Sequence, residues 1–174
     1  NTARRANVGF GVSNTDAMTA SGYVSAASAL TEIWNGSAWT EVADQNAAKY
    51  ARGGTGTTTN GILFGGEDPT TNTETWNGSS WTEVSELNTK GEYRSASGTA
   101  TQVLATGGYT ATANTELWNG SSWTEINNIS TARWEGGGTG SASFGMISGG
   151  NAPPITAATE EFTADNAVLT VTTS

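Results

Sequence analysis

The sequence predicts an all-β protein in which four four-stranded antiparallel units form a β-propeller. One observation is a Thr-Glu pair with an aromatic residue at the fourth position, which recurs at intervals of 42, 42 and 44 residues. A second is a double glycine ahead of that pair, and a third is an Asn-Gly turn signal behind it. Repeats of this length point to a propeller or a solenoid. The four copies are Thr31-Glu32-Ile33-Trp34, Thr73-Glu74-Thr75-Trp76, Thr115-Glu116-Leu117-Trp118 and Thr159-Glu160-Glu161-Phe162.

The second copy shows the expected elements most clearly. A run of small and β-branched residues predicts a first strand, and a short hydrophobic run closed by Gly65-Gly66 predicts a buried second strand. Two segments with alternating polarity predict the third and fourth strands, and Asn77-Gly78 between them is a strong hairpin signal. In order, the four strands are expected over 52–58, 62–64, 73–76 and 81–84.

The other copies follow the same plan. Val8 to Val12 opens a first strand, and the segment 168–171 can serve as a last one. No strand is then left over to be exchanged between the two ends of the chain. We therefore expect a single propeller domain over 1–174. Its repeats cover about 1–42, 43–85, 86–130 and 131–174.

A sheet of about 42 residues cannot bury both of its faces alone, so the copies must pack on one another. At this level the chain resembles the kelch repeat family, whose blades have a hydrophobic run, a double glycine and then two aromatic residues. The run 62–66 with Trp76 and Trp81 fits that pattern, as does the run 103–108 with Trp118 and Trp123. The resemblance implies a kelch-like β-propeller of four blades, in which the aromatic residues lie on the third and fourth strands.

Two copies depart from this pattern. The first has Ser21-Gly22 in place of the double glycine, and the last has Phe162 without a following Trp. Terminal repeats are often atypical. In short sequence motifs such as Trp-Asn-Gly-Ser-Ser-Trp-Thr-Glu-Val, the repeats are also similar to kelch-like repeats of virion structural and fibre proteins from tailed phages of marine bacteria. That likeness implies a source and a role and transfers no site residue.

The composition excludes several kinds of chemistry. Leu, Ile, Val and Phe are scarce and the net charge is −9, but seven Trp supply the apolar area for a core. The chain has neither Cys nor His, which removes thiolate chemistry, zinc-thiolate sites and the copper chemistry of kelch oxidases. We expect no cofactor. Since acidic residues outnumber basic ones 16 to 7, we expect no nucleic-acid partner, and no apolar run is long enough for membrane insertion.

The recurring glutamates Glu32, Glu74, Glu116 and Glu160 allow two interpretations. They are either scaffold residues, solvated or paired with an arginine near the start of each blade, or a ring that binds a hard cation such as calcium. A catalytic group would normally occur once, so we expect scaffold residues and no metal site. The arginines in question are Arg5, Arg52, Arg94 and Arg133.

The periodic Trp pairs and the Asn-Gly-Ser triplets also have functional alternatives. The Trp pairs are expected to pack between blades, with Trp76, Trp81, Trp118 and Trp123 largely buried, although a surface for stacking sugars is the alternative. The triplets match the glycosylation signal, but hairpin geometry already explains three of the four.

The expected binding residues lie at one end of the propeller. There, the loops after each second strand and the links between blades emerge together, whereas the Asn-Gly turns emerge at the other end. Binding surfaces on rigid scaffolds are commonly built from loops, and these loops differ from blade to blade. The candidates are Tyr50, Asp68, Pro69, Tyr93, Tyr109, Trp134, Asn151 and Pro153.

The sequence favours a non-enzymatic structural or binding propeller, a decoration, fibre or adhesin component of a virion, located in the virion or outside the cell. The expected partners are other virion or particle proteins, a second copy of the chain, or a host surface glycan. One alternative is a carbohydrate-active enzyme of the glycosidase type, which needs a facing carboxylate pair. Another is a regulatory kelch domain that binds peptides in a basic pocket. Because nothing latches a ring of four blades, we also expect the chain to need a partner.

Overall fold

The computed structural model describes residues 2–68, 70–109, 112–163 and 168–171, and confirms an all-β, four-bladed β-propeller without helices in those residues. Blade 1 contains β1 (Val8–Ser13), β2 (Asp16–Ala20), β3 (Thr31–Trp34) and β4 (Trp39–Glu41). Blade 2 contains β5 (Gly53–Thr57), β6 (Asn60–Phe64), β7 (Thr73–Trp76) and β8 (Trp81–Glu83). Blade 3 contains β9 (Ser95–Thr99), β10 (Gln102–Thr106), β11 (Thr115–Trp118) and β12 (Trp123–Glu125). Blade 4 contains β13 (Gly137–Gly140), β14 (Gly145–Ser148), β15 (Thr159–Phe162) and β16 (Val168–Val171).

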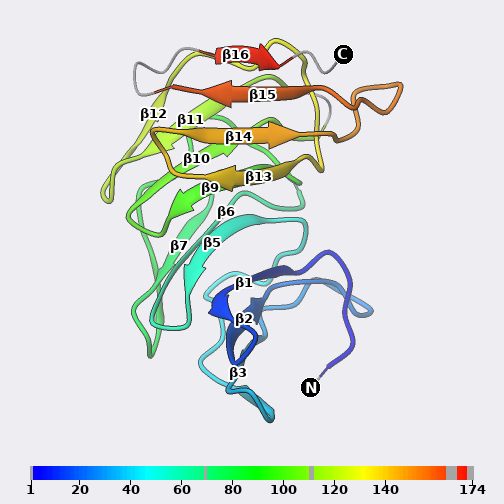
Figure 1. The fold of residues 1–174 in the computed structure, drawn as a ribbon. Coiled ribbons are helices and arrows are strands. Elements are labelled where there is room, and N and C mark those ends of the chain that lie inside the picture. Colours follow the sequence, from blue (N-terminus) through cyan, green and yellow to red (C-terminus); the bar gives the residue numbers. More distant parts are fainter. Residues whose placement is uncertain (1, 69, 110–111, 164–167, 172–174) are drawn as a thin grey trace.

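Each blade is an antiparallel meander in which the strands pair in chain order. The register repeats from blade to blade: Trp76 lies opposite Trp81 in blade 2, and Trp118 lies opposite Trp123 in blade 3. Figure 1 shows the four sheets following one another from blade 1, next to the N-terminus, to blade 4, next to the C-terminus. All strands of a blade come from one continuous segment, so no strand is exchanged between blades.

The double glycine ends the second strand because the next blade crosses it. Gly65 and Gly66 have φ angles of 65° and 126°, and residues with a side chain rarely adopt such backbone conformations. A Cβ atom on Gly65 would lie 2.1 Å from the carbonyl oxygen of Gly91, in the link to blade 3. The pattern recognised in the sequence therefore marks a close approach between blades.

The Asn-Gly turns are longer than the two-residue hairpins that the dipeptide suggests. In blade 2 the last strand pair is Trp76 with Trp81, which leaves a four-residue loop over 77–80. The Oδ1 atom of Asn77 accepts hydrogen bonds from the amides of Ser79 and Ser80 at 2.9 and 3.0 Å. The asparagine side chain thus closes the turn, as is common for Asn at the first position of a turn.

Blades pack through two different faces. We call the side facing the next blade the leading face and the side facing the previous blade the trailing face. At the interface between blades 2 and 3, Ile62 and Phe64 of the leading face pack against Val103 and Ala105 of the trailing face. The inner strands also pack in sequence, β1 on β5, β5 on β9 and β9 on β13.

Three hydrophobic cores result, one for each pair of consecutive blades. The expected burial of the Trp pairs is confirmed: Trp76 and Trp118 are 1% exposed, and Trp81 and Trp123 are 5% and 6% exposed. Within the described segments, β13 and β1 have no packing comparable to that of the other inner strands. Blades 1 and 4 therefore lie at the two ends of an arc (Figure 1).

Candidate functional site

The recurring glutamates are the buried centres of four ion pairs. Glu74 accepts from Arg52 at 3.0 Å, and Glu116 accepts from Arg94 at 2.9 Å, with all four side chains at most 1% exposed. Removing one member of such a pair would leave an uncompensated buried charge. The expectation of arginine partners is thus confirmed, whereas the alternative of solvated strand residues is wrong, because each carboxylate lies in the packed part of its blade.

In blade 1 the arginine that pairs with the glutamate is not the one expected. Glu160 pairs with Arg133, as expected, but Glu32 pairs with Arg4 at 2.9 Å and not with Arg5. Arg5 lies with its guanidinium carbon 4.9 Å from the ring centre of Tyr23. Neighbouring residues of this segment point in different directions, so only Arg4 reaches the carboxylate.

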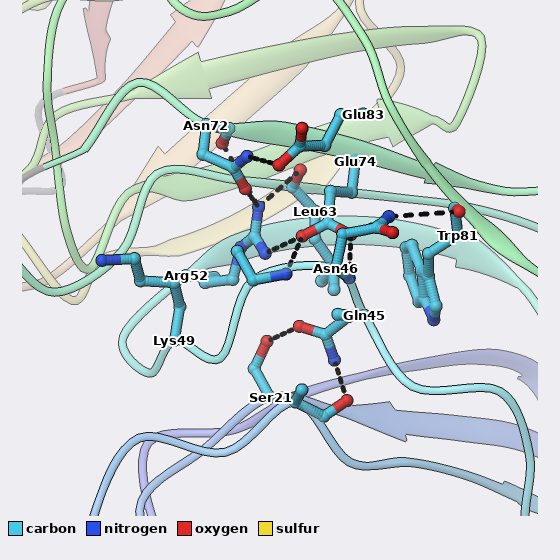
Figure 2. Close-up of polar contacts among 12 residues, drawn as sticks. Ser21, Gln45, Asn46, Lys49, Arg52, Leu63, Asn72, Glu74, Trp81 and Glu83 are labelled. Atoms are coloured by element: carbon cyan, nitrogen blue, oxygen red, sulfur yellow. Dashed lines mark hydrogen bonds and ion pairs between the residues drawn. The ribbon is translucent and has the colours of Figure 1, made fainter.

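The ion pairs also anchor the links between blades. Figure 2 shows Asn46, in the link before blade 2, reaching Glu74 and the main chain of Trp81. The main-chain and side-chain nitrogens of Asn46 donate to Glu74 Oε2 at 2.7 and 3.0 Å. Asn88 binds Glu116 with the same two distances. Because each link is tied to the core of the blade that follows, the loops around it are held in fixed positions.

A line of backbone hydrogen bonds joins the links that precede the inner strands of the four blades. One non-glycine residue just before each inner strand has a left-handed backbone, with φ between 53° and 57°. Such a conformation costs roughly 1–2 kcal/mol per residue. The amide of each donates to the carbonyl of the equivalent residue one blade earlier: Ala51 to Ala6, Tyr93 to Ala51, and Glu135 to Tyr93, at 2.9, 2.7 and 3.1 Å. The strained residues thus join consecutive blades.

Around this line, eight side chains form an arc in which each member adjoins the next. Each blade contributes two residues to the arc. One directly follows the glycine that ends the second strand, and the other directly precedes the left-handed residue of the blade. Within each blade these two residues share a backbone hydrogen bond. We call this set the loop-face arc. In order it contains Arg5, Tyr23, Tyr50, Glu67, Glu92, Tyr109, Trp134 and Asn151.

Aromatic pairs on the arc span the boundaries between blades. Tyr23 and Tyr50 meet edge to face with ring centres 5.1 Å apart, and Tyr109 and Trp134 meet in the same way at 5.3 Å. Tyr109 is 46% exposed, and the other three rings are partly exposed. Two aromatic surfaces therefore face solvent, one on each side of the acidic centre.

The acidic centre consists of Glu67 and Glu92. Burial raises the pKa of the Glu92 carboxyl, and the negative charges of Glu67 and Asp68 raise it further. Burial also raises the pKa of the Tyr50 hydroxyl, with Glu67 and Glu92 as the next causes. A ligand with a positive charge or with several hydroxyl donors would relieve the repulsion between these carboxylates.

The structure places four of the eight loop-face residues expected from the sequence in the arc. The arc contains Tyr50, Tyr109, Trp134 and Asn151, and Tyr93 supplies one of the left-handed positions beside it. Two others lie apart from it: Asp68 is exposed and adjoins the acidic centre, and Pro153 is exposed at the tip of the last loop. Pro69 lies outside the described residues.

Four arc residues are absent from the binding residues expected from the sequence: Arg5, Tyr23, Glu67 and Glu92. Tyr23 directly follows Ser21-Gly22, in the place that Glu67 and Tyr109 occupy after their double glycines. Aligning the copies on the glycines would have found it. Arg5 had no comparable signal, because two arginines stand side by side there and only the packing shows which of them is buried.

The described residues contain no group of three or more acidic side chains placed to hold a metal ion. None of their segments forms a helix long and apolar enough to cross a membrane. Comparison with protein-family models and with curated proteins found no match for this sequence.

Proposed function

We propose that this chain is a non-enzymatic, kelch-like structural and binding propeller, a decoration, fibre or adhesin component of a virion, and that it recognises its partner through the loop-face arc. The observation that carries the proposal is the gathering of all four tyrosines of the chain with Trp134 around Glu67 and Glu92. Aromatic and polar groups on loops held by a rigid scaffold are typical of binding surfaces. The proposed location is the virion or the outside of the cell.

The charges of the arc select the kind of partner. Four of the seven basic residues are buried in ion pairs, which leaves Arg5, Lys49 and Lys90 as the basic residues outside the cores. A nucleic acid or an acidic polymer would find few cations and a central carboxylate pair. The arc suits a neighbouring protein that presents Lys or Arg, or a neutral surface glycan whose sugar rings stack on the aromatic pairs.

A binding experiment with a matched control tests this proposal. The purified chain is applied to an array of neutral glycans and to an array of basic and neutral peptides. Tyr109→Ala combined with Trp134→Ala should remove the binding that the unmodified chain shows. Ser79→Ala combined with Ser121→Ala, at the Asn-Gly turns of the opposite end, should leave it unchanged. Loss of binding in the turn variant alone would contradict a role for the loop face.

The glycosidase alternative depends on the same carboxylates, and product formation separates it from binding. An enzyme would release reducing ends from a bound glycan, and Glu67→Gln or Glu92→Gln would abolish that release while retaining the glycan. Binding without any release of reducing ends supports the non-enzymatic role.

A further inference from the structure

Among the described residues, blades 1 and 4 each have one face that no other blade covers, called the bare face below. The trailing face of blade 1 contains Trp39, which is partly exposed, whereas its equivalents Trp81 and Trp123 are buried against the preceding blade. Hollows of about 480 Å³ and about 390 Å³ lie on the trailing side of blade 1 and the leading side of blade 4. Thr139 and Met146 line the second hollow. These are the two surfaces that a further blade would cover.

The hydrogen bonds that join consecutive blades also stop at these faces. The line of left-handed residues begins with the amide of Ala6 and ends with the carbonyl of Glu135, and neither group has a partner among the described residues. The second glycine of blades 1, 2 and 3 donates its amide to the next blade, for example Gly108 to Arg133 at 2.8 Å. The amide of Gly150, the equivalent in blade 4, has no such acceptor in the described part of the chain.

The space around the first glycine of each pair also differs between the interior blades and blade 4. A Cβ atom on Gly65 or Gly107 would lie within 2.3 Å of a carbonyl oxygen of the following blade. At Gly149 the nearest atom is the carbonyl oxygen of Thr156, 3.7 Å away in the same loop. A chain segment belonging to a next blade therefore fits over Gly149.

We propose that two copies of this chain associate head to tail, with the leading face of blade 4 of each copy packed on the trailing face of blade 1 of the other. The two identical contacts are related by a twofold axis and close an eight-bladed ring. This interface repeats the one already present between consecutive blades of a single chain. The proposal does not depend on any ligand of the loop face.

A second copy supplies the groups that the bare faces lack. In the interior, the indole nitrogen of Trp81 donates to Thr31 Oγ1 at 3.0 Å, and that of Trp123 donates to Thr73 Oγ1 at 3.1 Å. The equivalents at the open ends are Trp39 in blade 1 and the partly exposed Thr159 in blade 4. In the dimer, Trp39 of one copy donates to Thr159 of the other, and the amide of Ala6 donates to the carbonyl of Glu135.

One residue at the proposed interface does not follow the interior pattern. Glu161 lies opposite Met146, at the place where blades 1, 2 and 3 have Ile33, Thr75 and Leu117. Burying a carboxylate against another blade weakens the contact. Glu161→Thr should therefore tighten the dimer, and Met146→Glu should weaken it, each by about tenfold or more in the dissociation constant.

The first test is the mass in solution. Analytical ultracentrifugation between about 1 and 100 μM, a range that covers common dimer affinities, should show a species of twice the 17.8 kDa chain mass. Met146→Glu should remain folded by circular dichroism and should need a concentration at least about tenfold higher than the unmodified chain to form the same fraction of dimer. Ile155→Glu, at a site 82% exposed on a loop, is the matched control and should remain a dimer. A monomer throughout this range for the unmodified chain would overturn the proposal.

The second test fixes the geometry with a disulfide, because the chain has no cysteine of its own. A Cβ atom on Gly145 would lie 3.2 Å from Ser97 Cβ across the interface between blades 3 and 4. The equivalent positions at the open ends are Ala17 and Thr139. Ala17→Cys with Thr139→Cys should therefore form disulfide-linked dimers on mild oxidation, with both 17–139 links identified by mass spectrometry.

Each other outcome of the cross-linking argues against this geometry. A 17–139 link within a monomer would mean that the four blades close on themselves. A ladder of larger species would mean an open filament, and a 17–17 link would mean a face-to-face contact. The control is Val24→Cys with Thr139→Cys, which combines an exposed loop position in blade 1 with the same β13 position. This variant should form no disulfide.

Discussion

Interior and terminal blades carry the same repeat but differ in what surrounds it. In blades 2 and 3 a Trp on the fourth strand is buried against the preceding blade and donates its indole N–H to a threonine there. In blade 1 the equivalent Trp39 packs against no other blade of the described structure and is partly exposed. The comparison teaches that a position in the repeat gains its role from its neighbours, so the same residue is core in one copy and surface in another.

The ion pairs show the converse, because every blade has a buried arginine–glutamate pair although the arginine does not occupy the same sequence position in every blade. Arg52 and Arg94 directly follow the left-handed residue of their blades. Arg4 and Arg133 stand two residues before theirs, yet each guanidinium group reaches the equivalent glutamate of its own blade. What is kept from blade to blade is the charge pair in space.

The largest expected effect breaks an interior ion pair. Glu116→Ala leaves the guanidinium of Arg94 buried and unpaired, and should lower the free energy of unfolding by about 3–5 kcal/mol. Urea denaturation followed by Trp fluorescence measures this. The double variant Arg94→Met with Glu116→Leu should regain part of the loss, because no charge is left buried, although Asn88 still lacks its acceptor. A loss below about 1 kcal/mol for Glu116→Ala would contradict the importance of the pair.

The next effect compares an interior Trp with its terminal equivalent. Trp81→Ala should cost about 3–5 kcal/mol, as truncations of buried aromatic residues do. Trp39→Ala should cost only about 1–2 kcal/mol when measured in the Met146→Glu variant at a concentration where that variant is a monomer, because part of the Trp39 ring already meets solvent. Ser80→Ala, beside Trp81 in the exposed turn, is the control and should have almost no effect. Equal losses for the two Trp variants would contradict the bare face of blade 1.

A smaller effect separates two threonines that the repeat makes equivalent. Thr73 Oγ1 accepts from Trp123, whereas Thr115 Oγ1 is buried without a hydrogen-bond partner in the described structure. The reason is that blade 4 has Val168 opposite Phe162, where the earlier blades have a second Trp. Thr73→Val should cost about 1–2 kcal/mol by leaving an indole N–H unpaired, whereas Thr115→Val should be neutral or stabilising. Thermal melts of the two variants provide the test.

The smallest effect is a pH dependence at Glu92, which lies in an interior link where the terminal blades have Arg5 and Trp134. Its pKa is raised, so between the unfolded and folded values the folded state binds more protons than the unfolded state. The stability contributed by this group therefore falls as the pH rises through the folded pKa. Compared with Glu92→Gln, the wild type should gain stability as the pH is lowered from about 8 to about 5. Unfolding midpoints that shift in the opposite direction would contradict this sign.

The sequence by itself determined the blades. Hydrophobic alternation, double glycines and the Trp pairs are local signals that recur along the chain, so the strand order and the burial of Trp76 and Trp118 could be predicted from the repetition. The loop face could be predicted as well, because an antiparallel meander sends alternate connections to opposite ends.

Only the tertiary structure decided how the copies differ. Whether Arg4 or Arg5 reaches Glu32 depends on side-chain direction in a short segment, and neighbouring residues of that segment have no periodic signal. The arc of Tyr23, Tyr50, Glu67 and Glu92 depends on contacts between blades, which link residues distant in the sequence. The bare faces of blades 1 and 4 depend on which blades contact one another, a property of the assembled structure that no single repeat contains.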